Sequence, residues 1–161
     1  MNQPVRLPAS LPAGFDLDAV QWMRITGGPE FDYPIDYAYA VPSADAATGR
    51  VEFLVKWEPN AYCHYHRHLG ATEVTVLRGE QHIYEERAFE TVHKVRKAGF
   101  TGRLPDGEVH MEHGGAEGMT ILFSIHAPDG RLFDLLDRAG NTLMTVTIDD
   151  VIARRLGTPE G

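Results

Sequence analysis

The sequence contains only one cysteine, Cys63, and fewer basic than acidic residues. A single cysteine excludes an internal disulfide framework. The 15 lysines and arginines are outnumbered by 23 aspartates and glutamates, and the net charge of −8 argues against non-specific binding to nucleic acid or anionic membranes. The chain also lacks an 18-residue apolar run, and its first residues lack the apolar core of a signal peptide. We therefore expect a cytoplasmic protein with no nucleic-acid partner and no membrane association.

The length and the distribution of prolines indicate one domain preceded by an arm. Pro4, Pro8 and Pro12 fall within residues 1–18 and favour an extended segment over a packed element. The remaining residues, 19–161, suit a single domain, because a chain of this size can bury roughly 70% of its unfolded surface.

The body of the chain shows short strands separated by turn signals. Val51, Phe53 and Val55 alternate with polar residues, which is the period of a strand with one buried face. Apolar segments over 119–125 and 131–136 are separated by a Pro-Asp-Gly turn. Strands and helices do not alternate along the chain, so the pattern predicts an all-β sandwich or barrel.

One helix is predicted, and it comes last. Thr147 is a candidate N-cap, and Asp149 and Asp150 suit the positive end of a helix dipole. Arg155 suits the last turn, and Gly157 follows as a stop. The sequence therefore predicts a short C-terminal helix.

The histidines are concentrated in two segments. His64, His66 and His68 fall within five residues, and His110 and His113 fall within four. Residues two apart on a strand point to the same face with Cα atoms about 7 Å apart, so two imidazoles can converge on one cation through bonds of about 2.0–2.2 Å. Such a pair supplies half of a metal site, and the other half must come from a second strand.

A second spaced pattern leads to His110. Gly99, Pro105, Gly107 and His110 form the sequence G-x5-P-x-G-x2-H. The proline and the second glycine are typical of a tight turn, and that turn would begin the strand that brings His110 inward. Two patterns in this order indicate one site built from both segments.

Together the patterns resemble the two motifs of the cupin superfamily, G-x5-H-x-H-x3–4-E-x6-G and G-x5-P-x-G-x2-H-x3-N. The resemblance covers residues 60–114. It departs from the family pattern at three places: Asn60 replaces the first glycine, Gly79 comes one residue early after Glu73, and Gly114 replaces the final asparagine. The resemblance implies a cupin jelly-roll β-barrel with the short C-terminal helix, and a homodimer, because small cupins generally pair.

The resemblance also implies a ligand set for one divalent metal ion per chain. It identifies His66, His68 and His110 as ligands, with Glu73 as a fourth. His64 and His66 form an alternative pair, but only His66 and His68 place Glu73 at a family spacing. Without Glu73 the site would have three histidines and open coordination positions, which suit Fe(II) and substrate chelation.

Strand parity suggests the surroundings of this site. Glu112 shares parity with His110, so it either orients a ligand or acts as a base, or it is a solvated carboxylate at a strand end. His64 is a second candidate for a catalytic or supporting role. The candidate pocket walls are Tyr62, Thr75, Leu77 and Phe123.

The His66-x-His68-x-Gly70 stretch is similar to that of three-histidine cupin dioxygenases, the acetylacetone and 2,4′-dihydroxyacetophenone dioxygenases. This likeness implies a non-haem Fe(II) enzyme that uses O₂ to cleave a C–C bond of a small diketone or hydroxyketone. Histidine ligands also suit Zn, Ni or Mn. Two alternatives stay open: an isomerase or lyase that uses the metal as a Lewis acid, and a non-catalytic cupin that senses a metal or ligand.

Overall fold

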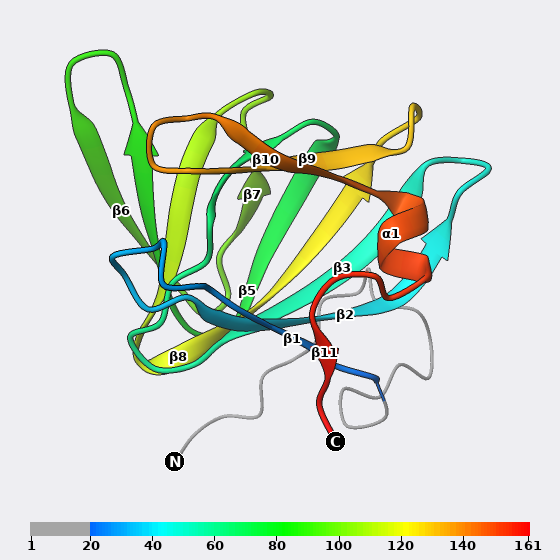
Figure 1. The fold of residues 1–161 in the computed structure, drawn as a ribbon, viewed down its shortest axis with the longest axis horizontal. Helices are drawn as coiled ribbons and strands as arrows, with labels where there is room; N and C mark the ends of the chain where they lie inside the picture. Colours follow the sequence, from blue (N-terminus) through cyan, green and yellow to red (C-terminus); the bar gives the residue numbers. More distant parts are fainter. Residues whose placement is uncertain (1–19) are drawn as a thin grey trace.

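The computed structural model describes residues 20–161, so the arm predicted over 1–18 lies outside the described residues. Within this part of the chain, strands curl into an open barrel and one short helix packs at its side (Figure 1). The all-β fold with a C-terminal helix is therefore confirmed. The strands are β1 (Met23–Thr26), β2 (Asp36–Asp45), β3 (Arg50–Trp57), β4 (Tyr65–His68), β5 (Ala71–Glu86), β6 (Thr91–Lys97), β7 (Thr101–Arg103), β8 (Val109–His126), β9 (Arg131–Leu136), β10 (Thr142–Thr147) and β11 (Thr158–Pro159).

All pairs of these strands are antiparallel. The main path runs β10-β9-β4-β8-β3-β2-β1-β11, and β5 joins it by pairing with β8 and carries β6 and β7. The long strand β8 is central. Its first part pairs with β4 and β5, and its second part, from Met119 onward, pairs with β3 and β5. One strand thus connects the segments that carry the predicted metal ligands.

A pair of glycines lets the paired strands β5 and β8 approach closely where their register shifts. Gly79 and Gly118 both have positive φ, +73° in each case. A Cβ on Gly79 would lie 2.1 Å from the carbonyl oxygen of Gly118, which is closer than any Cβ can approach an oxygen, so only glycine fits at this position. The two backbones therefore touch at this bulge, and the sheet bends there.

The sheet buries side chains on both faces. Val51, Phe53 and Val55 point into the barrel, as the alternating pattern predicts. Leu54 is also fully buried, because Trp22 covers the outer face of the sheet at this position. This small outer core contains Ala40, Leu54, Leu77 and Leu122.

The helix α1 (Ile148–Ile152) begins as predicted and ends early. The Thr147 hydroxyl accepts a hydrogen bond from the Asp150 backbone N–H, and the Asp150 carboxylate accepts one from the Thr147 backbone N–H, which completes a capping box. Arg154 has a left-handed φ of 54°, so Arg155 lies beyond the helix rather than in its last turn. No helix in residues 20–161 is long and apolar enough to cross a membrane.

Candidate metal centre

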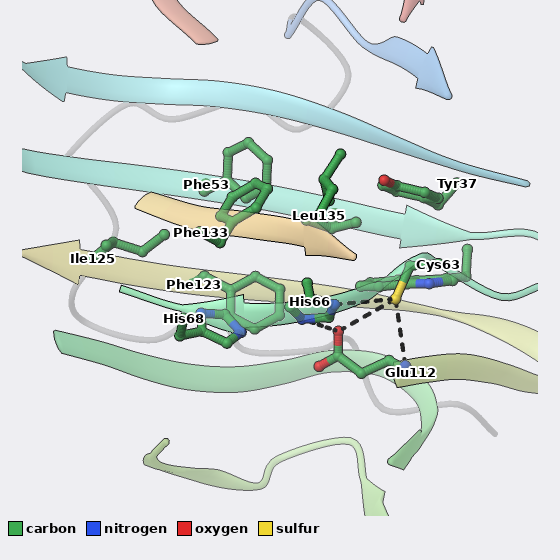
Figure 2. Close-up of a pocket in the computed structure, with 12 residues that line it drawn as sticks. Tyr37, Phe53, Cys63, His66, His68, Glu112, Phe123, Ile125, Phe133 and Leu135 are labelled. Carbon is green, nitrogen blue, oxygen red and sulfur yellow. Dashed lines mark hydrogen bonds and ion pairs between the residues drawn. The ribbon is translucent and has the colours of Figure 1, made fainter. Parts of the chain in front are cut away.

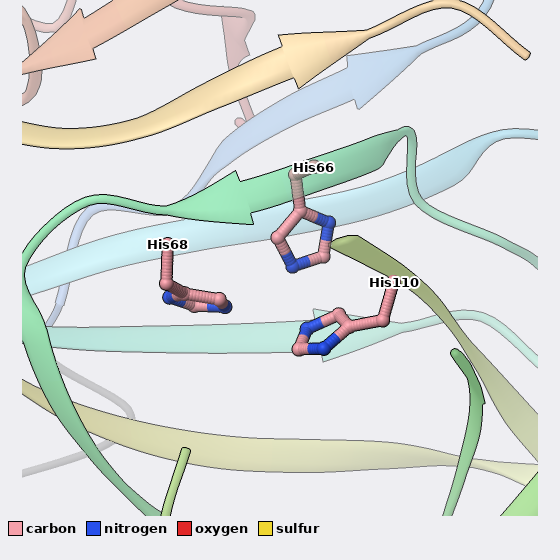
Figure 3. Close-up of side chains that lie close together, drawn as sticks. All are labelled: His66, His68 and His110. Carbon is pink, nitrogen blue, oxygen red and sulfur yellow. The ribbon is translucent and has the colours of Figure 1, made fainter. Parts of the chain in front are cut away.

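Three buried imidazoles converge inside the barrel (Figure 3). The strand β4 carries His66 and His68 on one face, and β8 places His110 directly opposite His66. The ring centroids are 4.6 Å apart between His66 and His110, 5.0 Å between His66 and His68, and 5.1 Å between His68 and His110. One nitrogen of each ring lies within 4.8 Å of the other two. The structure therefore brings together the three histidines that the motifs predict as ligands.

The outer nitrogens of two rings are held by hydrogen bonds. Nδ1 of His66 donates to the carbonyl oxygen of His64 at 2.9 Å, and Nδ1 of His110 donates to the Glu108 carboxylate at 3.0 Å. In a neutral imidazole whose Nδ1 carries the proton, the lone pair is on Nε2. Both rings therefore present Nε2 as a ligand atom.

The third ring is fixed by Thr72. The Thr72 hydroxyl donates its only proton to the carbonyl oxygen of Gly70 at 2.9 Å, so at 3.3 Å from His68 it accepts the proton of Nδ1. The Nε2 atoms of His68 and His110 are buried and have no protein partner. Buried nitrogens are rarely left unpaired, and three lone pairs with supported rings fit one divalent transition metal ion.

The pKa values favour the neutral imidazoles that metal binding requires. Burial, together with the nearby His110, lowers the pKa of His66 to about 3. Burial and the two neighbouring rings lower the pKa of His68 well below its usual value. Both rings are therefore neutral at pH 7, and a metal ion does not have to displace a proton from either.

A buried carboxylate, that of Glu112, completes the polar part of the site. Its side chain is 1% exposed, and its Oε1 accepts a hydrogen bond from Nε2 of Gln81 at 2.6 Å. Its oxygens lie 3.7 Å from Nε2 of His66 and 3.9 Å from Nε2 of His110. Burial raises the pKa of Glu112, while His110 and the Gln81 hydrogen bond oppose that rise. The alternative of a solvated carboxylate at a strand end is therefore wrong.

Two further residues belong to the site and were not predicted. Cys63 is buried beside Glu112, and with His66 these residues form a second group of converging donors. Gln81 is fully buried and contacts Glu112. The alternation of β5 indicates an inward Gln81, because Ile83 two residues later is a buried strand residue. Cys63 precedes β4 and carries no periodic signal of its own.

Glu73 does not lie at the site, so its prediction as a metal ligand is wrong. It is exposed on the outside of β5, where its carboxylate lies 3.7 Å from Arg103. Thr72 and Val74 point inward, so alternation turns Glu73 outward. The six-residue spacing before Gly79 in the cupin motif in fact fits Thr72, which supports His68 instead of binding metal through a carboxylate.

A mostly apolar cavity opens beside the imidazoles (Figure 2). It gives the centres of water-sized molecules about 40 Å³, enough for a few waters or part of a small ligand. His66, His68, Cys63 and Glu112 form its polar side. The rest of its lining is Tyr37, Phe53, Val55, Trp57, Phe123, Ile125, Phe133 and Leu135.

Of the four predicted wall residues, Phe123 alone lines this cavity. Tyr62 stacks on His113 at 4.7 Å, away from the lining. Thr75 points outward to the Thr101 hydroxyl, and Leu77 packs in the outer core. Thr75 and Leu77 share strand parity with Glu73, so the alternation that turns Glu73 outward turns them outward as well.

His64 lies near the centre but does not join the converging nitrogens. Its Nδ1 is 3.2 Å from the Tyr37 hydroxyl, and its ring packs edge-on against Phe31. Burial lowers the pKa of His64. Its direct contribution to the centre is the backbone carbonyl that orients His66.

Solved structures show the class of the fold. The chain superposes on a putative acetylacetone dioxygenase from Methylibium petroleiphilum PM1 with a TM-score of 0.65 at 13% identity, covering 92% of this chain and 98% of that one. An acetylacetone dioxygenase from Acinetobacter johnsonii gives 0.64 at 11%, covering 95% and 94%. An RmlC-like cupin protein from Ralstonia eutropha JMP134 gives 0.64 at 18%, covering 91% and 90%. The fold is that of a cupin.

A comparison of the sequence with family profiles identifies a particular family of cupins. The profile of the ChrR cupin-like domain matches residues 13–128, and the chain belongs to that family. No curated protein sequence matches the chain at a significant level.

Proposed function

We propose that this protein is a metal-dependent cupin enzyme, and that it uses Fe(II) and O₂ to cleave a C–C bond of a small diketone or hydroxyketone. The observation that carries the proposal is the convergence of three buried imidazoles, each with Nδ1 held and Nε2 directed to one point beside an apolar cavity. The likeness in fold to acetylacetone dioxygenases supports the same reaction class.

The ligand set explains why a ketone is the substrate class we propose. With Glu73 outside the site, three imidazoles would hold the ion, and a metal with only these protein ligands would keep positions for substrate. Fe(II) bound there would supply positive charge for the oxygens of an enolised ketone and a redox centre through which the electron-rich enolate could pass its electrons to dioxygen.

The chain's own residues position the substrate and move its proton. Phe53, Phe123 and Phe133 surround the alkyl groups of the substrate and exclude water. The Glu112 carboxylate would accept the proton that leaves the substrate on enolisation, because its Oε2 lies 3.7 Å from Nε2 of His66, at the converging nitrogens. Gln81 holds that carboxylate in place through its hydrogen bond to Oε1.

The first test is metal content together with oxygen uptake. We expect protein loaded anaerobically with Fe(II) to hold one iron per chain and to consume O₂ when acetylacetone is added. The variant His110→Ala should lose both properties, whereas His126→Ala, which removes an exposed histidine at the end of β8, should keep both. Failure of the wild type to bind any divalent metal would contradict the proposal at its base.

Glu112 also supports a second candidate, an isomerase or lyase in which the metal acts only as a Lewis acid. A buried carboxylate beside a metal centre can remove a proton without any oxidation. Turnover of a hydroxyketone under argon with Zn²⁺ would favour this reading over the dioxygenase. Metal binding without turnover in either assay would leave a ligand-sensing module.

The predicted homodimer stays a prediction. Sedimentation equilibrium of the full chain would decide it, since a dimer has twice the monomer mass of 17.9 kDa.

A further inference from the structure

Cys63 is fixed at the polar side of the cavity by two backbone hydrogen bonds. Its own N–H donates to the carbonyl oxygen of Glu112 at 3.0 Å, and the N–H of Glu112 donates to Cys63 Sγ at 3.4 Å. The residue just before β4 is thereby clamped to β8. The sulfur accepts an N–H at this position, and such a donor also stabilises a metal-bound thiolate.

The thiol of Cys63 lies beside the His66 ring and the Glu112 carboxylate (Figure 2). Cys63 Sγ is 4.0 Å from Oε2 of Glu112, and the same oxygen is 3.7 Å from Nε2 of His66. In a tetrahedral zinc site, bonds of about 2.3 Å to sulfur and about 2.1 Å to oxygen and nitrogen place these donors about 3.6 and 3.4 Å apart. These two separations exceed the tetrahedral values by a few tenths of an ångström, and all three donors lie within 4.8 Å of one another, so side-chain rotations would have to draw them together around the ion.

From this arrangement we infer that the cavity holds a second, overlapping metal position, made by Cys63, His66 and Glu112, that takes a thiophilic divalent ion such as Zn²⁺ or Co²⁺. The two positions share His66, so one ion occupies either of them and not both. When the metal–sulfur bond forms, the Cys63 thiol releases its proton to solvent and the thiolate stays as ligand.

The chemical consequence is metal discrimination at one centre. Thiolate favours zinc, cobalt and other soft or borderline ions, while imidazole with open positions suits Fe(II). A buried thiol beside the three-imidazole site therefore raises the affinity for zinc without raising that for manganese. The inference rests on the proposed metal centre and adds a ligand to it.

The test is a cobalt titration of the metal-free full chain, followed by absorption. We expect about one Co²⁺ per chain with a sulfur-to-cobalt charge-transfer band in the near ultraviolet. In Cys63→Ser the cobalt should still bind through the imidazoles and give visible d–d bands, but without the charge-transfer band. Zinc affinity should fall at least about tenfold in this variant, while manganese affinity stays unchanged.

Each outcome decides between the two proposals. Cobalt that binds the wild type with a spectrum identical to that of Cys63→Ser overturns the thiolate position and leaves the three-imidazole centre. Absence of cobalt binding in the wild type overturns both. If Cys63→Ser fails to fold, X-ray absorption of the wild-type zinc form still decides, because a sulfur neighbour at about 2.3 Å scatters differently from nitrogen and oxygen.

Discussion

Two groups of three histidines lie on opposite faces of the sheet around β8, and they differ in what their ring nitrogens contact. The inner triad is His66, His68 and His110, and the outer triad is His82, His93 and His113. Both triads have ring centroids about 5 Å from a neighbour, so proximity does not separate them. The two triads differ instead in the direction of their ring nitrogens, which converge on one point only in the inner triad.

The outer rings are engaged with one another and with tyrosines. Nδ1 of His82 and Nε2 of His93 share a hydrogen bond of 2.9 Å, and His93 stacks on Tyr84 at 4.6 Å. His113 lies flat against Tyr62. Among the described residues the converging donor groups come from the inner face only. Partners on the far side of each ring, rather than a high local density of histidine, are therefore what builds a metal site.

The largest difference should appear when one histidine is removed from each triad. We expect His68→Ala to lower the affinity for Zn²⁺ by more than about 100-fold, since losing a mere supporting residue already costs about 10–100-fold. The matched variant His82→Ala should bind zinc as the wild type does. Competition with a chromogenic chelator measures both. Equal losses in the two variants would erase the distinction between the triads.

Acid should destabilise the metal-free protein through the inner triad. The folded pKa of His66, about 3, is below the unfolded value of about 6.5, so between these pH values the unfolded chain binds a proton that the folded chain does not. Stability is therefore complete above about pH 6.5 and falls as the pH decreases, by up to about 1.4 kcal/mol per pH unit for this histidine. The pKa of His68, shifted in the same direction, steepens the fall.

Urea unfolding of the metal-free protein at pH 5 and pH 7 would measure this dependence. In His66→Gln the difference between the two pH values should shrink by the contribution of one histidine. A free energy of unfolding that does not change between pH 7 and pH 5 would show that the inner rings are not held neutral.

A smaller effect should follow from loss of the support for His68. Thr72→Val keeps the side-chain shape and removes the hydroxyl that accepts the Nδ1 proton, so zinc affinity should fall about tenfold. Thr72→Ser retains a hydroxyl and should restore most of the affinity. Isothermal calorimetry at constant pH is the measurement, and a Val variant with wild-type affinity would mean that the ring needs no partner.

The smallest effect should come from breaking the outer pair. His93→Phe keeps a ring to stack on Tyr84 and removes the hydrogen bond to His82 at an exposed position, where one such bond contributes about 0.5–1.5 kcal/mol. We expect a loss of stability within that range and no change in metal content. Loss of metal in this variant would show that the outer triad acts on the inner one.

The sequence predicts the inner triad well because local spacing determines it. A His-x-His pair on a strand shares a face whatever that strand pairs with, and the Gly-Pro-Gly turn sets the start of β8. The error at Glu73 has the opposite origin. Two family spacings fit the chain, and only the inward or outward direction of β5 decides that Thr72, and not Glu73, faces the site.

The cavity walls could not be predicted from strand parity. Phe133 and Leu135 reach the site because β9 pairs with β4, a long-range choice that no local period shows. Leu77 faces away because it shares parity with Glu73 and Thr75, which alternation along β5 turns outward. Cys63 and Glu112 meet through backbone hydrogen bonds between segments 49 residues apart.

The strand β8 pairs with β3, β4 and β5 along its length, and this pairing has a consequence for how ligands enter and leave the cavity. Amides near His110 and near Phe123 belong to one continuous ladder, so opening the sheet beside the cavity would require most of the barrel to unfold. Hydrogen exchange at both places should then report the same slow, global event. We therefore expect ligands to enter and leave by side-chain rearrangement while the pairing of β8 stays intact, so that the residence time of a bound molecule depends on its own contacts.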